Sequence, residues 1–218
     1  GFPGAYVTGG TANATRYIAI NCAFTAAGTN SVIQSNTIGG FALYTSSTAT
    51  TTNGVFCGIN VTAGNVTIGG ASGALGNTIG ATSGLGSIYT AATATGGTAV
   101  GIYVTSTNTV TIQNNSIGGV DAVGTTASLA GGFTGIDGAG AGGNYTISNN
   151  TIGNTTADNI RTGYTLNGTN LSNTGSVLTS TTGGTAAIVG IRCTATGSLI
   201  SITSNTLRGI ATSGTTTA

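Results

Sequence analysis

Short runs of alternating apolar and polar residues recur along the chain, and each run ends near asparagine or glycine. The stretch 99–119, AVGIYVTSTNTVTIQNNSIGG, holds the pattern in its fullest form. Its alternation predicts one strand over 101–104, with Ile102 and Val104 facing inward, and a second strand over 110–112. An asparagine corner and a third short strand ending in SIGG then complete one turn. We therefore expect this stretch to be one coil of a stacked β-solenoid.

Five segments of the chain carry the same third-strand pattern. Their equivalent apolar residues are separated by 41, 38, 35 and 55 residues, and they are Ile38, Ile79, Ile117, Ile152 and Leu207. A second motif, of the type G-I-x-V, precedes each segment and begins at Ala19, Gly58, Gly101, Gly135 and Gly190. Loops of variable length between persistent strand motifs are typical of solenoids.

These repeats predict an all-β fold, a parallel β-helix (β-solenoid) that forms a single domain over residues 1–218. We expect about five coils, each with three short strands, joined by long inter-coil loops. The coil count is open between residues 154 and 189, where TGYTLNGTNLS has the pattern of an extra partial coil. Neighbouring coils lie about 4.8 Å apart, so that equivalent side chains stack directly on one another.

One asparagine stands two positions before each third-strand apolar residue. Asparagine tolerates left-handed backbone and turns the chain, and stacked amides bond to one another along a column. The sequence therefore predicts a structural asparagine ladder made of Asn36, Asn77, Asn115, Asn150 and Asn205.

The ISNNTIGG-like segments and the G-I-x-V strands resemble the parallel β-helix repeats of large secreted bacterial surface and adhesin-like proteins. The resemblance covers most of the chain, and it implies a right-handed helix with three strands in each coil. The handedness agrees with the general right-handedness of parallel crossovers. The long inter-coil loops, above all that of residues 154–189, depart from the pattern of short, regular coils.

The composition narrows the functional classes. The chain has four arginines, three aspartates and 40 glycines, with no Lys, Glu, His or Met. Long helices are not expected without the usual helix formers, and a net charge of +1 offers no basic patch for nucleic acid. Apolar runs are too short for insertion into a membrane. We expect a processed product or a piece of a longer protein, secreted to the cell surface or the extracellular space.

Few residues are available for catalysis. Polysaccharide-cleaving enzymes of this fold class need acids, bases or metal ligands on one face, and the only acidic residues here are Asp121, Asp137 and Asp158. Asp121 and Asp158 are expected in loops after the third strand, and a pair across neighbouring coils stays open. Asp137 and Arg192 are expected to form a solvated surface pair. We predict no enzymatic activity, no cofactor and no metal site.

The chain has three cysteines, which is an odd number. Cys22 and Cys193 occupy equivalent inward positions in the first and last coils, about 19 Å apart over four coil steps, which is beyond disulfide reach. Either they are buried free thiols, as Cys57 is expected to be, or they mark an inter-subunit contact. In the second case the last coil of one unit stacks on the first coil of the next.

Asparagine sequons are frequent. Those expected in loops are the better candidates for glycan attachment, and they are Asn13, Asn154, Asn167 and Asn170.

Three functional hypotheses remain for a β-solenoid of this composition. An uncapped solenoid exposes unpaired strands, and the linker from Leu207 to Ile20 of a following unit would be 31 residues, within the internal range of 19 to 39. The leading hypothesis is therefore a structural extracellular protein that assembles with itself end to end into a fibre, sheath or adhesin stalk, with covalent glycans as an option. The alternative is a glycan- or ice-binding module that uses the outward column Val32, Thr67, Thr111, Thr146 and Ser201. A polysaccharide-processing enzyme is the third.

Overall fold

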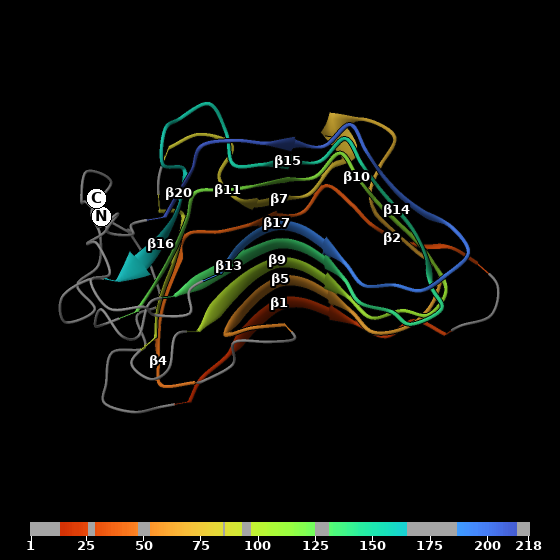
Figure 1. Cartoon of the computed structure of the whole chain (residues 1–218), viewed down its shortest axis with the longest axis horizontal. Coiled ribbons are helices and arrows are strands. Elements are labelled where there is room, and N and C mark those ends of the chain that lie inside the picture. The colour runs from red at the N-terminus through yellow and green to blue at the C-terminus, as the bar shows by residue number, and fades with distance from the viewer. Residues whose placement is uncertain are drawn as a thin grey trace, which may run out of the picture.

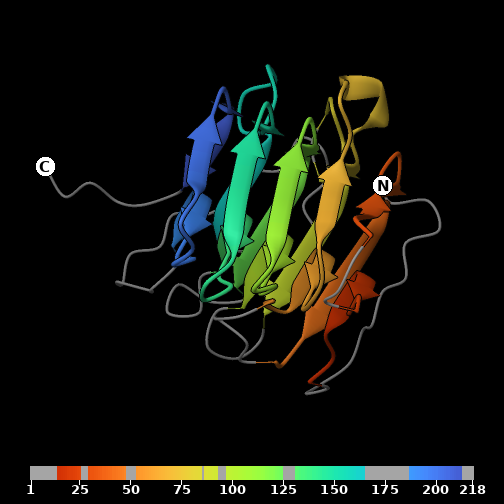
Figure 2. The same ribbon diagram turned by 90° about the vertical axis from the view of Figure 1, so that its right-hand side faces the viewer.

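The computed structural model describes residues 14–25, 29–47, 53–84, 86–92, 97–124, 131–164 and 187–212. In this part of the chain the strands form four parallel sheets of five strands each, and every sheet takes one strand from each coil. Figure 1 shows the four sheets as the four sides of the coil, and Figure 2 shows the five coils side by side in chain order. The parallel β-helix expected from the repeats is confirmed.

The first sheet contains the G-I-x-V motifs. Its strands are β1 (Tyr17–Cys22), β5 (Phe56–Val61), β9 (Thr98–Val104), β13 (Gly132–Gly138) and β17 (Ile188–Cys193). The second sheet consists of β2 (Ser31–Ile33), β6 (Val66–Gly69), β10 (Thr109–Gln113), β14 (Asn144–Ser148) and β18 (Ile200–Thr203). The third sheet consists of β3 (Thr37–Ile38), β7 (Thr78–Gly80), β11 (Ser116–Gly118), β15 (Thr151–Ile152) and β19 (Thr206–Leu207).

A fourth sheet corrects the expectation of three strands per coil. Its members lie in segments that the repeat pattern predicts as inter-coil loops, and they are β4 (Phe41–Thr45), β8 (Ile88–Ala92), β12 (Val120–Gly124), β16 (Ile160–Tyr164) and β20 (Ile210–Thr212). A single 3-10 turn, η1 (Gly73–Leu75), lies in the insertion of the second coil. The sequence does not predict this sheet because its strands share no motif. Their inward positions combine large residues such as Ile88 with small ones such as Ala122.

Like residues stack on like in the core, as the repeat register predicts. In the second sheet Ile33, Ile68, Ile112, Ile147 and Ile202 form one column, and in the third sheet Ile38, Ile79, Ile117, Ile152 and Leu207 form another. Ile68, Ile112 and Ile147 are completely buried. Such aliphatic columns supply most of the burial that holds the coils together.

The core is thin between the first and third sheets, and this explains the glycine of the G-I-x-V motif. A Cβ atom on Gly101 would lie 2.8 Å from Cδ1 of Ile117 and 2.5 Å from the carbonyl oxygen of Gly135. Gly58 and Gly135 face the same obstacle from Ile79 and Ile152. Only the first coil has alanine, Ala19, at this position.

Candidate functional site

The five ladder asparagines lie in one column at the corner between the second and third sheets. Each Oδ1 from Asn77 to Asn205 accepts two hydrogen bonds from the asparagine of the preceding coil, one from its backbone N–H and one from its Nδ2, at 2.8 to 3.1 Å. From Asn77 to Asn205 each Nδ2 also donates to a backbone carbonyl of the preceding coil, for example that of Ile68 for Asn115, at 2.9 Å, whereas Nδ2 of Asn36 donates to Gln34 of its own coil. The ladder therefore has a direction, with donors pointing toward the next coil.

The interior members of the ladder have no room for a ligand. Asn77, Asn115 and Asn150 are at most 1% exposed, and neighbouring coils use both the oxygen and the nitrogen of each amide. Buried amides that are fully bonded in this way rigidify a core and fix its register. The geometry gives this column a structural role.

In four of the five coils the corner is turned by the residue before the ladder asparagine; the exception is the second coil, where Gly76 has a φ of −69°. Left-handed backbone occurs at Ser35, Asn114, Asn149 and Ser204, with φ between 55° and 57°. This differs from the sequence-based prediction, in which the ladder asparagines themselves turn the chain. Because their amides must point into the column, the preceding residue takes the strained conformation instead.

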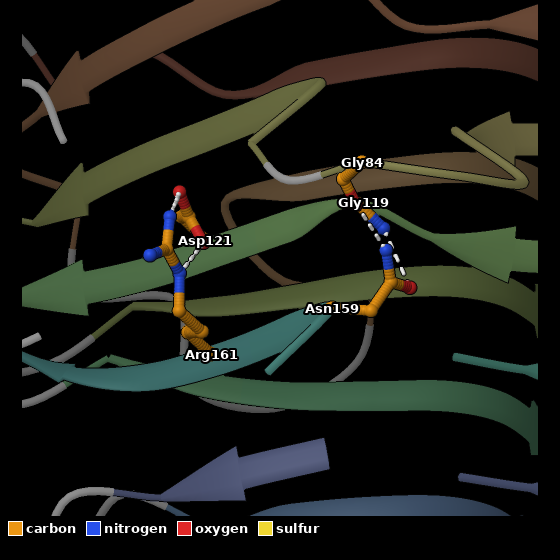
Figure 3. A network of polar contacts seen from close by, with 5 residues as sticks. All are labelled: Gly84, Gly119, Asp121, Asn159 and Arg161. Carbon is orange, nitrogen blue, oxygen red and sulfur yellow. Dashed lines mark hydrogen bonds and ion pairs between the residues drawn. The ribbon is translucent and has the colours of Figure 1, made fainter. Parts of the chain in front are cut away.

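A buried ion pair joins two strands of the fourth sheet. Arg161 of β16 donates to both carboxylate oxygens of Asp121 of β12 at 2.6 Å, and the Asp121 side chain is completely buried (Figure 3). Burial raises the pKa of Asp121 above its ordinary value, while the Arg161 guanidinium opposes that rise. The expected position of Asp121 in a loop is wrong, because it lies within the fourth sheet.

Asn159 ties three successive coils together next to this pair. Its Oδ1 accepts the backbone N–H of Gly119 at 3.0 Å, and its Nδ2 donates to the carbonyl of Gly84 at 2.6 Å (Figure 3). The arrangement is a second asparagine-based corner, at the junction of the third and fourth sheets. Sequence reasoning missed it because no neighbouring coil repeats the residue.

A second ion pair lies on the outer face of the first sheet. Arg192 donates to both carboxylate oxygens of Asp137 at 3.0 and 2.5 Å. The Asp137 side chain is 1% exposed and that of Arg192 is 45% exposed, so only the arginine is solvated. Burial and the nearby Asp137 carboxylate raise the pKa of Tyr103 in the same column.

The acidic residues do not form a paired acid and base. Asp121 and Asp137 are each held by an arginine of the next coil, and Asp158 lies exposed in a turn with φ of 56°. Within the described ranges no group of three or more His, Cys, Asp or Glu residues is placed to hold a metal ion.

The cysteines differ in environment. Cys22 and Cys193 are partly exposed, and they lie in one column of the first sheet, at opposite ends of the stack. Cys57 is completely buried, and burial raises the pKa of its thiol to about 12.

Of the four sequons chosen from the sequence, only Asn154 lies in the described part of the chain. Asn154 is 6% exposed, and its Oδ1 accepts the backbone N–H of Thr156 at 2.6 Å. Asn13, Asn167 and Asn170 lie outside the described residues. Glycan attachment stays a prediction at all four.

The two ends of the stack differ in shape. Between β1 and β3, at the first coil, lies a hollow of about 330 Å³, lined by Tyr17, Ala19, Ile20 and the segment 36–39. At the last coil, core-column side chains reach solvent instead: Ile200 is 39% exposed, Ile202 46% and Leu207 49%. The last coil is therefore the end at which core-column side chains are incompletely packed.

Comparisons with protein-family models, curated proteins and solved structures give no match for this chain. Where the structure describes the chain, it holds no helix with the length and apolar character needed to cross a bilayer.

Proposed function

We propose that this chain is a structural protein of the cell surface or extracellular space, a subunit or repeat of a fibre, sheath or adhesin stalk. In this proposal the coils of successive units stack end to end. The observation that carries it is the last coil, whose core residues Ile200, Ile202 and Leu207 are 39% to 49% exposed although they continue columns that are buried in the preceding coils.

Exposed apolar columns and open strand edges favour association. A coil that presents unpaired N–H and C=O groups on all four sides is a template for another coil. Solenoids that remain monomeric cover such edges with polar caps. The described last coil instead repeats the interior pattern in LISITSNTLRG, and the charged Arg192 of its strand β17 is paired with Asp137 of the preceding coil.

A structural role also agrees with the chemistry of the chain. Its two described ion pairs join neighbouring coils rather than line a cavity, and its interior amides are used within the ladder. Secretion and an adhesin-like context are supported by the resemblance of the repeats to those of secreted bacterial surface proteins. Covalent glycans would attach to loop asparagines, outside the ladder.

Sedimentation velocity over a range of protein concentrations tests this proposal. We expect wild-type chain to form species that grow with concentration. The Ile202→Lys variant places a charge on the exposed end and should stay monomeric, while Thr146→Lys, on the outer face of an interior strand, should assemble like wild type. A wild-type chain that remains monomeric at all concentrations would contradict the proposal.

A second function is favoured by the outer face of the second sheet. Register places Val32, Thr67, Thr111, Thr146 and Ser201 in one flat column across all five coils. Rows of hydroxyls at the coil spacing can order water or hold a glycan. Thermal hysteresis measured on wild type and on Thr111→Lys tests this alternative, which requires hysteresis in the first and its loss in the second.

A further inference from the structure

The asparagine ladder gives the stack a chemical direction. At each interior step, the backbone N–H and Nδ2–H of one asparagine donate to Oδ1 of the next, as Asn150 does to Asn205 at 3.0 Å. At the last coil, Nδ2 of Asn205 donates one hydrogen to the carbonyl of Ile147 at 2.8 Å, and no further ladder asparagine in the described chain receives its second hydrogen or the backbone N–H. At the first coil, Asn36 uses its donors toward Asn77 and Gln34, and no ladder asparagine of the described chain donates to its Oδ1. One end therefore offers two donors and the other end an acceptor.

The shapes of the ends complement each other in the same sense. Leu207 protrudes at the last coil, in the column that begins with Ile38 at the first coil. The hollow between β1 and β3 is lined by Ile38 together with Tyr17, Ala19 and Ile20. A copy of the last coil placed one coil spacing before β1 would put Leu207 over this hollow. The exposed Leu207 would then contact the lining of the hollow, of which Tyr17 is 46% exposed and Ile38 is 8% exposed.

We propose that the last coil of one copy docks in register on the first coil of a second copy, head to tail, with Asn205 donating to Oδ1 of Asn36 in the second copy. This contact between the last coil of one copy and the first coil of the next is called the joint below. It rests on the proposed function, since it specifies how the units stack. All four sheets would continue in parallel across it. A head-to-tail contact does not close on itself and so propagates into a filament.

Contact between two identical ends is disfavoured by the same observations. Two last coils facing each other would run their strands antiparallel and would bring donors of Asn205 toward donors. They would also place the exposed Ile202 and Leu207 side chains against one another. The occupant of the exposed end is therefore the first coil of another copy.

The joint brings together two cysteines that lie far apart within one chain. Register puts Cys193 in the column that begins with Cys22. Across the joint their Cα atoms would be about 4.8 Å apart, within the range of roughly 4.4 to 6.8 Å seen for disulfides. Inside one chain the separation is about 19 Å over four coil steps, so no intramolecular bond forms.

Oxidative cross-linking of the assembled chain with copper–phenanthroline tests the joint. The oxidant removes two electrons and two thiol protons as one S–S bond forms. We expect a series of covalently linked oligomers of increasing size on a non-reducing gel. We also expect a disulfide-linked peptide that joins Cys22 to Cys193. Cys22→Ser and Cys193→Ser should each abolish the cross-links, since the buried Cys57 is out of reach.

The outcomes separate the joint from the proposed function. Filaments that yield no Cys22–Cys193 link, or dimers that persist in either serine variant, would overturn the joint while leaving end-to-end assembly intact. A chain that sediments as a monomer would overturn both.

A matched pair of variants tests the polarity directly. Asn205→Asp would set a carboxylate against the Asn36 oxygen, so we expect the association constant to fall about tenfold or more. Thr203→Asp adds the same charge to the same coil on an exposed strand position, and it should assemble like wild type. Equal effects of the two substitutions would contradict the ladder contact.

Discussion

Ile147 and Ile202 occupy the same column of the second sheet, one coil apart, but their environments are opposite. Ile147 is completely buried, whereas Ile202 is 46% exposed. The same contrast separates Ile152 from Leu207 in the third sheet, with exposures of 0% and 49%. The residue types are those of an interior coil in both places. A coil of this sequence is therefore built to be covered on both sides, and the fourth and fifth coils differ mainly in what lies beyond them.

The largest expected difference in stability is between a substitution of an interior ladder asparagine and the same substitution of the terminal one. Asn115→Ala removes an amide that accepts two bonds from Asn77 and donates to Asn150 and to the carbonyl of Ile68. Because several buried polar groups lose their partner, we expect unfolding to become easier by about 4 kcal/mol. Asn205→Ala should cost only about 1 kcal/mol, because water reaches the groups it leaves. Urea unfolding of the dilute chain measures both, and equal losses would contradict the contrast.

The next contrast concerns aliphatic packing. Ile147→Ala leaves a cavity inside a closed column, and we expect a loss of about 3 kcal/mol in the free energy of unfolding. Ile202→Ala trims a side chain that is already half exposed, so its loss should stay below about 1 kcal/mol. Thermal unfolding at low concentration compares the two. A large loss for Ile202→Ala in the monomer would mean that its side chain is covered there.

A smaller loss of stability is expected between the first and third sheets, where the core is thin. Gly101→Ala sets a methyl group 2.8 Å from Cδ1 of Ile117 and 2.5 Å from a backbone oxygen. We expect a loss of about 2 kcal/mol from overpacking. The matched control is Ala19→Gly in the first coil, with a loss of about 0.5 to 1 kcal/mol from chain entropy alone. Unfolding curves in which Gly101→Ala is neutral would show that the sheets can separate there.

Thiol reactivity gives the smallest perturbation. At pH 8, iodoacetamide should label Cys22 and Cys193 of the dilute chain but not Cys57, whose pKa of about 12 keeps it protonated in its buried site. Mass spectrometry of labelled peptides reads this out. Assembly should protect the two end cysteines, and labelling that does not change between dilute and assembled chain would contradict their burial at a joint.

The sequence was most informative where coils share a motif. The spacing of the ISNNTIGG-like segments was enough to predict the coil register, including the columns of Ile38 and Asn36. The fourth sheet was missed because FALYT, IYTAA, VDAVG and IRTGY share no pattern. The Asp121–Arg161 pair depends on that sheet, so it could not be predicted without it. The burial of Asp137 was also missed, since alternation assigns a face to a residue but does not show what covers that face.

Cryo-electron microscopy of the assembled chain tests end-to-end stacking most directly. Five coils at about 4.8 Å each predict an axial rise of about 24 Å per subunit, with the four sheets continuous through every joint. Filaments with that rise and with the last coil paired to the first coil of the next subunit would support the account. Discrete particles, or filaments whose subunits meet through their side faces, would contradict it.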